Sequence, residues 1–153
     1  MQHKLSLDLD DYLPYLVNRV GSTAVAIFIT EALAAEHLTI DMWRALAALN
    51  HDGAQRQVDL SARTSIEPSS LSRVAARLES MGLVARQRSK TSSREVMVTL
   101  SPKGSALVSR LIPIAHKLED AAIKGIPAKD VKVLKRTLQL VFDNLAKNSS
   151  QPR

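Results

Sequence analysis

Cysteine is absent from the 153-residue chain, and aromatic residues make up only 3% of it. Without cysteine the chain cannot form disulfides, thiolate metal sites or a cysteine redox sensor, which is compatible with the cytosol. With so few aromatic side chains, the core must consist of Leu, Val, Ile and Ala, as in helical proteins. The four histidines, His3, His37, His51 and His116, show no metal-ligand spacing, so we expect no metal and no cofactor.

Long apolar segments are also lacking. The N-terminal stretch MQHKLSLDLDDYL has no apolar core of the kind a secretory signal needs, and the apolar run 24–29 is interrupted by Thr30 and Glu31. We therefore expect no membrane segment and a cytoplasmic protein. The length fits a single domain over residues 1–153.

Sequence signatures of catalysis are missing as well. The chain contains no phosphate-binding P-loop, no GxGxxG, no nucleophile elbow and no paired acid and base at a useful spacing. We therefore expect no catalytic residues and a protein that is not an enzyme.

Positive charge is concentrated in one third of the chain. The net charge is +6, and residues 54–104 contain nine Lys and Arg against four Asp and Glu, whereas the remainder contains twelve against eleven. A local excess of this kind is typical of proteins that bind nucleic acid.

Residues 57–82 have the pattern of a helix-turn-helix. A short helix over 57–64 is followed by a turn at Ser65 and Ile66. A second helix begins at Pro68, because the missing N–H of proline needs no partner in a first turn. Four apolar residues then recur at helical spacing, and Gly82 ends the helix. These residues are Leu71, Val74, Ala75 and Leu78.

The polar side of the second helix carries Ser69, Ser70, Ser72, Arg73 and Arg77. Short hydroxyls and guanidinium groups near the start of a helix suit phosphates and base edges in a DNA major groove. We also expect the two leading serine hydroxyls to cap free N–H groups of the first turn. The alternative is the solvated face of an ordinary bundle helix.

A basic β-hairpin follows the second helix. Apolar and polar residues alternate over 83–88 and 94–100, on either side of the polar turn 89–93. Four basic residues lie in this segment: Arg86, Arg88, Lys90 and Arg94. A basic hairpin after a recognition helix is typical of a wing that enters an adjacent groove, and the alternative is a loose cationic hairpin.

Long helices flank this lobe. Helical spacing covers residues 8–35, and it covers 102–147 with a break at 125–127. Their apolar seams exceed what one small winged helix can cover, so we expect a two-fold partner. The predicted fold class is mainly α with a small β-hairpin wing. It combines a winged helix-turn-helix over 40–101, its first helix capped by Thr39, with long N- and C-terminal dimerisation helices.

This order of elements resembles the MarR family of winged-helix transcriptional regulators. The resemblance covers about residues 10–147 and is carried by the stretches 60–66, 69–73, 77–84, 92–94 and 98–104. It implies a homodimer in which the first, fifth and sixth helices interlock. Two positions depart from the family pattern. Ser92 replaces the aspartate that usually pairs with wing residue Arg94, and Arg56 replaces a Ser or Thr cap, which weakens that cap or adds a phosphate contact.

The resemblance also implies a function. We expect a ligand-responsive regulator, in most such proteins a repressor, that binds a pseudo-palindromic operator in double-stranded DNA as a homodimer. A small-molecule effector would release it. The alternative is a weakly specific or architectural DNA-binding protein without an effector. The operator, the regulated genes and the identity of the effector stay open.

Residues 15–21 are similar to the first helix of MarR-type regulators that control the breakdown of aromatic acids. In those proteins a pocket lies between the dimerisation layer and the winged helix. The resemblance implies that Arg19 binds an aromatic carboxylate, that Trp43 offers a flat wall and that Ser22 adds a hydroxyl. The alternatives are a surface or dimer-contact role for Arg19 and core packing for Trp43.

Overall fold

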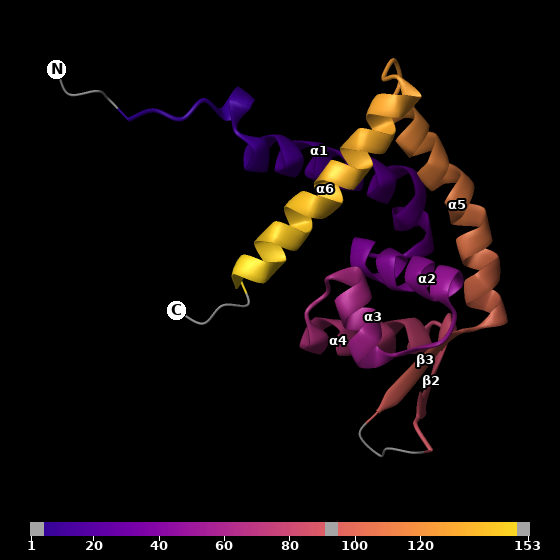
Figure 1. Ribbon diagram of the computed structural model, residues 1–153. Coiled ribbons are helices and arrows are strands. Elements are labelled where there is room, and N and C mark those ends of the chain that lie inside the picture. The colour runs from indigo at the N-terminus through magenta and orange to yellow at the C-terminus, as the bar shows by residue number, and fades with distance from the viewer. Residues whose placement is uncertain (1–4, 91–94, 150–153) are drawn as a thin grey trace. The chain divides into compact units, whose positions relative to one another are not determined.

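The computed structural model describes residues 5–90 and 95–149, which form helices and one small antiparallel sheet (Figure 1). The predicted fold class is confirmed. The helices are α1 Leu13–Phe28, α2 Ile40–Asp52, α3 Gln57–Thr64, α4 Pro68–Ser80, α5 Pro102–Ala122 and α6 Ala128–Ser149, and the strands are β1 Gln55–Arg56, β2 Val84–Arg88 and β3 Val96–Leu100.

The chain contacts divide into two compact units, residues 1–116 and 117–153. The first unit contains the helix-turn-helix and the wing, and the second contains the end of α5 and all of α6. A single domain over 1–153 stays a prediction.

The first long helix begins later than the predicted residue 8. Leu9–Asp11 form a separate 3-10 turn, and α1 starts at Leu13 with Pro14 in its first turn. After Phe28 the helix continues as a π turn over Ile29–Leu33 and a 3-10 turn over Ala34–Glu36. It ends at His37, whose φ of 55° is left-handed.

The stretch Leu13–Glu36 corrects one expectation. It is 24 residues long and contains an 18-residue window with a mean hydropathy of 1.3, so it is long and apolar enough to cross a membrane by length and composition alone. The expectation that no apolar run approaches this length was therefore wrong, because Thr30 and Glu31 do not offset the surrounding Val, Ile, Ala and Phe. A helix that another protein chain covers has the same composition.

The helix-turn-helix encloses a leucine core. Leu46 of α2, Leu60 of α3 and Leu71 of α4 are each 0% exposed. Ile66 seals the angle between α3 and α4 as predicted: it is buried, and its carbonyl accepts a 2.6 Å hydrogen bond from the Ser61 hydroxyl. The predicted boundaries of α3 and α4 are confirmed.

The cap of α4 differs from the prediction. Glu67, rather than a serine hydroxyl, accepts the hydrogen bond from the Ser70 N–H (3.1 Å), and it also accepts one from the Ser69 hydroxyl. A glutamate one residue before Pro68 reaches the first turn, and its negative charge suits the positive end of the helix dipole. These hydrogen bonds, from Ser69 first, lower the pKa of Glu67.

The sheet has the strand order β1-β3-β2, with both pairings antiparallel. β2 and β3 form the predicted hairpin, in which Val84 lies opposite Leu100 and Arg88 lies opposite Val96. β1 was not predicted, because two residues are too few to show alternation. It joins the segment before α3 to the returning strand of the wing.

The predicted start of α5 is confirmed, and it is attached to the end of α4. The Ser101 hydroxyl accepts from the Gly104 N–H (3.0 Å) and donates to the Gly82 carbonyl (2.7 Å). A Cβ at Gly104 would lie 2.1 Å from the carbonyl oxygen of Leu83, so only glycine fits there.

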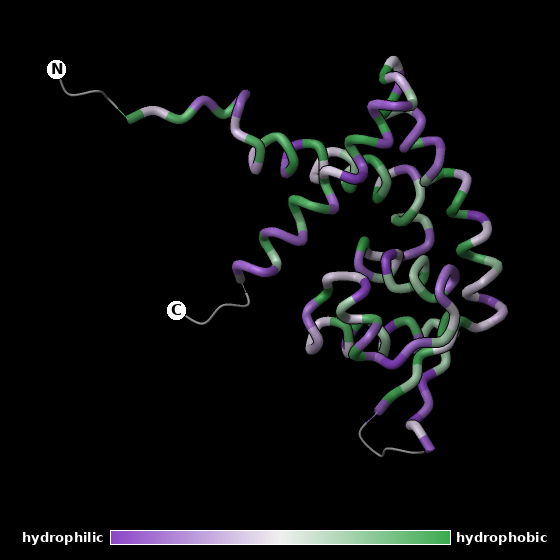
Figure 2. Tube along the Cα trace, in the orientation of Figure 1, coloured by the Kyte–Doolittle hydropathy of each residue, from purple (hydrophilic) through white to green (hydrophobic). Residues whose placement is uncertain are grey.

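The second unit buries little of its apolar surface. Among its described residues Val131 is buried, whereas Leu134, Leu138 and Leu145 of α6 are 44%, 39% and 64% exposed. Figure 2 shows apolar and polar residues recurring along α6. Lys135 forms an ion pair with Glu119 of α5 within this unit.

Candidate nucleic-acid interface

The predicted contact residues of α4 lie on the side away from its leucine stripe. Ser69, Arg73 and Arg77 are exposed and follow one another at four-residue spacing, which places them along one face. Ser70 and Ser72 are half-buried beside this row, and Arg73 donates a 3.3 Å hydrogen bond to the Ser70 hydroxyl. The structure thus brings all five together, and their contact with DNA stays a prediction.

The predicted wing residues are in different situations. Arg88 and Lys90 are exposed, whereas the Arg86 side chain is 28% exposed and forms an ion pair with Glu79 of α4 (2.7 Å). Arg86 lies on the same face of β2 as the buried Val84, because side chains alternate along a strand. Arg94 lies outside the described residues.

Arg56 joins α3 to the start of the returning wing strand, an arrangement that the sequence did not predict. Its guanidinium donates to both carboxylate oxygens of Asp59 (2.6 and 2.9 Å) and to Glu95 (3.1 Å). It makes no side-chain cap of α3. These hydrogen bonds, from Asp59 first, raise the pKa of Arg56, and the hydrogen bond from Arg56 lowers the pKa of Asp59.

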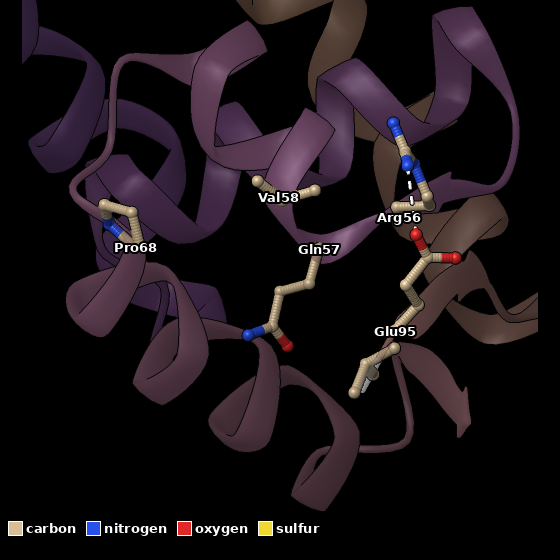
Figure 3. Close-up of a pocket in the computed structure, with 6 residues that line it drawn as sticks. Arg56, Gln57, Val58, Pro68 and Glu95 are labelled. Atoms are coloured by element: carbon tan, nitrogen blue, oxygen red, sulfur yellow. Dashed lines mark hydrogen bonds and ion pairs between the residues drawn. The ribbon is translucent and has the colours of Figure 1, made fainter. Parts of the chain in front are cut away.

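Arg56 and Glu95 also border a pocket of about 190 Å³ between α3, the start of α4 and the wing. Figure 3 shows Arg56 and Glu95 facing each other at one edge, with Pro68 on the opposite side and Gln57 between them. The spacing of Arg56 and Asp59 was visible in the sequence as an i, i+3 pair. Glu95 is 39 residues away, and no sequence signal joined it to Arg56.

The three residues predicted to bind an effector are not together within one subunit. Trp43 packs against Phe28 of α1 with ring centroids 5.3 Å apart. Arg19 is exposed and precedes Phe28 by nine residues, about two and a half helical turns, so it lies on the opposite face of α1. The Ser22 hydroxyl donates to the Arg19 carbonyl (3.2 Å).

Trp43 instead borders an open groove of about 310 Å³ on the outer side of α2 and α3. Arg44, His51 and Arg63 line the same groove. Arg44 and Arg63 are paired with Asp41 (3.3 Å) and Asp52 (2.9 Å). Within residues 5–90 and 95–149 no group of three or more His, Asp or Glu side chains could hold a metal ion.

Known proteins are similar to this chain in sequence and in fold. A sequence profile of the MarR family matches residues 38–96. A MarR-family transcriptional regulator from Silicibacter pomeroyi is 30% identical, with a TM-score of 0.81 over 92% of this chain and 96% of that one.

Two further relatives are 28% identical to the chain. BpsR of Bordetella bronchiseptica, whose structure addresses regulation of its DNA binding by 6-hydroxynicotinic acid, has a TM-score of 0.77 over 84% of this chain and 97% of that one. The HTH-type transcriptional repressor Rv2887 of Mycobacterium tuberculosis aligns over 130 residues, 85% of this chain and 93% of that protein.

The matched segment 38–96 contains α2, the helix-turn-helix and most of the wing, so it covers the surface described above. The relatives are named as transcriptional regulators or repressors, which indicates a regulator rather than an enzyme. Identity of 30% along almost the whole of one relative, with the same fold, shows that this chain belongs to the MarR family of transcriptional regulators.

Proposed function

We propose that this regulator is a ligand-responsive repressor that binds a pseudo-palindromic operator in double-stranded DNA as a homodimer. The observation that carries the proposal is the exposed row Ser69, Arg73 and Arg77 on α4, with exposed Arg88 and Lys90 on the adjoining wing. A recognition helix and a basic wing on one lobe suit a major groove and the backbone beside it.

Exposed apolar surface on α1 and α6 supports the homodimer. On α1, Leu13, Val17 and Val20 are 49%, 43% and 68% exposed, and the leucines of α6 are similarly uncovered. A second copy would cover these faces through a two-fold interface. We therefore assign dimerisation to residues 8–35 and 102–147 and DNA binding to 40–101. Two copies would present their α4 helices about 34–36 Å apart, one DNA turn.

An aromatic carboxylate is the proposed class of effector. BpsR, the relative whose DNA binding is regulated by 6-hydroxynicotinic acid, supports this class. Because Trp43 of α2 packs on the face of α1 opposite Arg19, a pocket that holds both would take Arg19 from one subunit and Trp43 from the other. Such a ligand releases DNA if it binds more tightly to a dimer whose α4 spacing does not fit the operator.

A footprint on the DNA upstream of this gene tests the central proposal. A bounded, palindromic protected site is the expected result, and uniform coating would identify a weakly specific DNA-binding protein instead. Arg73→Ala should cost about 1–3 kcal/mol at that site if Arg73 contacts a base. Lys90→Ala should weaken binding to all DNA sequences alike and reduce the salt dependence of binding. Lys132→Ala on α6 is the matched control.

Calorimetry with 6-hydroxynicotinic acid, benzoates and hydroxycinnamates tests the effector. Binding that Arg19→Ala weakens and that releases the operator is the expected result. An Arg19→Ala protein that responds to the ligand as the wild type does would overturn the assignment of Arg19, and the repressor proposal would stand.

A further inference from the structure

Two ion pairs attach the wing to the rest of the lobe: one joins β2 to α4, and the other joins the residue before β3 to Arg56 of β1, which directly precedes α3. In β2, the Arg86 guanidinium contacts Glu79 of α4 through two nitrogens, at 2.7 and 2.9 Å. The Arg86 backbone N–H donates to the other oxygen of the same carboxylate at 3.2 Å. Both Glu79 oxygens therefore accept from one residue of the wing.

The second attachment lies at the start of the returning strand. Glu95 directly precedes β3, and its carboxylate accepts a 3.1 Å hydrogen bond from Arg56, which precedes α3. The same guanidinium donates two further hydrogen bonds to Asp59 of α3. Arg56 therefore links α3 to the wing. The side chains of Arg56 and Glu95 are 46% and 37% exposed.

These contacts have a mechanical consequence. A two-stranded hairpin is marginally stable by itself, and here each strand has five residues. Val84 and Val98 anchor the base of the hairpin in the core, but β1 supports it with only two residues. Beyond the buried base, the angle between the wing and α4 depends on side chains that bridge the two.

We propose that the Glu79–Arg86 and Arg56–Glu95 pairs form a brace that holds the wing at the angle at which Arg88 and Lys90 meet DNA. Arg86 and Arg56 are then positioning residues, and neither is a phosphate contact. This proposal rests on the proposed function, because it takes the wing to be a DNA-binding element.

A brace and a direct phosphate contact predict changes of opposite sign in DNA affinity when an acidic side chain is removed. Removing a carboxylate from a DNA-binding lobe normally strengthens binding, because the repulsion of phosphates decreases. If Glu79 and Glu95 brace the wing, Glu79→Ala and Glu95→Ala instead weaken binding. A surface ion pair of this kind corresponds to about a two- to fivefold change in Kd.

The test uses the full-length protein and a mixed-sequence 30-base-pair duplex, whose binding does not require the operator to be known. The expected result is weaker binding by Glu79→Ala and by Glu95→Ala. Asp41→Ala is the matched control: its carboxylate is paired with Arg44 within α2, so its loss should not weaken binding. Tighter or unchanged DNA binding by both Glu79→Ala and Glu95→Ala would overturn the proposal.

A double-mutant cycle separates positioning from contact. If Arg86 acts through Glu79, Arg86→Ala has little further effect in the Glu79→Ala background. If Arg86 contacts a phosphate, its loss is equally large in both backgrounds and reduces the salt slope by about 0.9. The second result would overturn the assignment of Arg86.

Hydrogen exchange without DNA gives an independent measure. Amides of β2 and β3 should exchange faster in Glu79→Ala and Glu95→Ala, while those of α2 keep their protection. Unchanged exchange in the wing would overturn the brace. If the wild type fails to bind the duplex, the proposed function fails, and the exchange experiment still decides whether the brace exists.

Discussion

The helix-turn-helix lobe and the C-terminal helix α6 are both amphipathic, but they bury their apolar residues to different extents. Leu46, Leu60 and Leu71 in the lobe are 0% exposed, whereas Leu138 and Leu145 of α6 are 39% and 64% exposed. The lobe covers its own core within one chain. In α6 the apolar face is left uncovered, and we attribute it to the interface with a second copy.

This difference shows that helical periodicity predicts an apolar face without predicting what covers it. Leu71 and Leu78 of α4 recur as regularly as Leu134, Leu138 and Leu145 of α6, yet only the first pair lies in a core of the same chain.

The largest effect is expected from Leu138→Glu. A charge in the middle of the apolar face of α6 should abolish both dimerisation and operator binding, because two copies would have to bury it. Sedimentation and a DNA-binding assay measure the two losses. Gln139→Glu makes the same change in charge at the neighbouring position and should leave both intact, and a monomeric wild type at micromolar concentration would contradict the dimer.

The next largest effect is expected when a leucine is shortened to alanine, and the loss of stability should differ between the two regions. Leu46→Ala should lower the free energy of unfolding by about 2–5 kcal/mol, because it leaves a cavity in the lobe. Leu140→Ala on α6 should change it by less than about 0.5 kcal/mol if this side chain stays exposed. Urea denaturation at one protein concentration measures both. A large loss with Leu140→Ala would place that residue in the interface.

A smaller effect is expected at the first turn of α4. Glu67→Ala removes the side-chain cap and should lower the thermal stability. Asp130→Ala, in the first turn of α6, should cost less, because an acid near a helix start contributes only about 0.3–1 kcal/mol through the dipole. Thermal unfolding of the two variants gives the comparison, and equal losses would show that the hydrogen bond to Ser70 adds nothing.

The smallest effect concerns pH. The hydrogen bond from Arg86 lowers the pKa of Glu79 below its ordinary 4.5 in the folded protein. A depressed folded-state pKa gives a contribution that is complete above the unfolded-state value and is lost as the pH falls through the folded-state value. The protection of the wing amides from hydrogen exchange should therefore be constant from about pH 8 to about pH 5 and decline at more acidic pH. Exchange rates of the β2 amides, corrected for intrinsic rates, check this, and Glu79→Ala should lack the acidic component.

The sequence by itself determined much of the local structure. Pro68 and Pro102 marked the starts of α4 and α5, and Gly82, with a φ of 74°, marked the turn into the wing. These boundaries depend on a few consecutive residues and on backbone conformations that proline and glycine favour. The row Ser69, Arg73 and Arg77 was predictable for the same reason, because four-residue spacing places side chains on one face of a helix.

Tertiary structure alone decided which residues are partners across the chain. Arg56 meets Glu95, Arg86 pairs with Glu79, and Trp43 packs on the face of α1 opposite Arg19. Gly104 is required because the Leu83 carbonyl approaches it, which nothing in its local sequence indicates. Such contacts join segments that are distant in sequence, and they form only when several helices and strands have packed together. The spacing of residues within one segment therefore does not predict them.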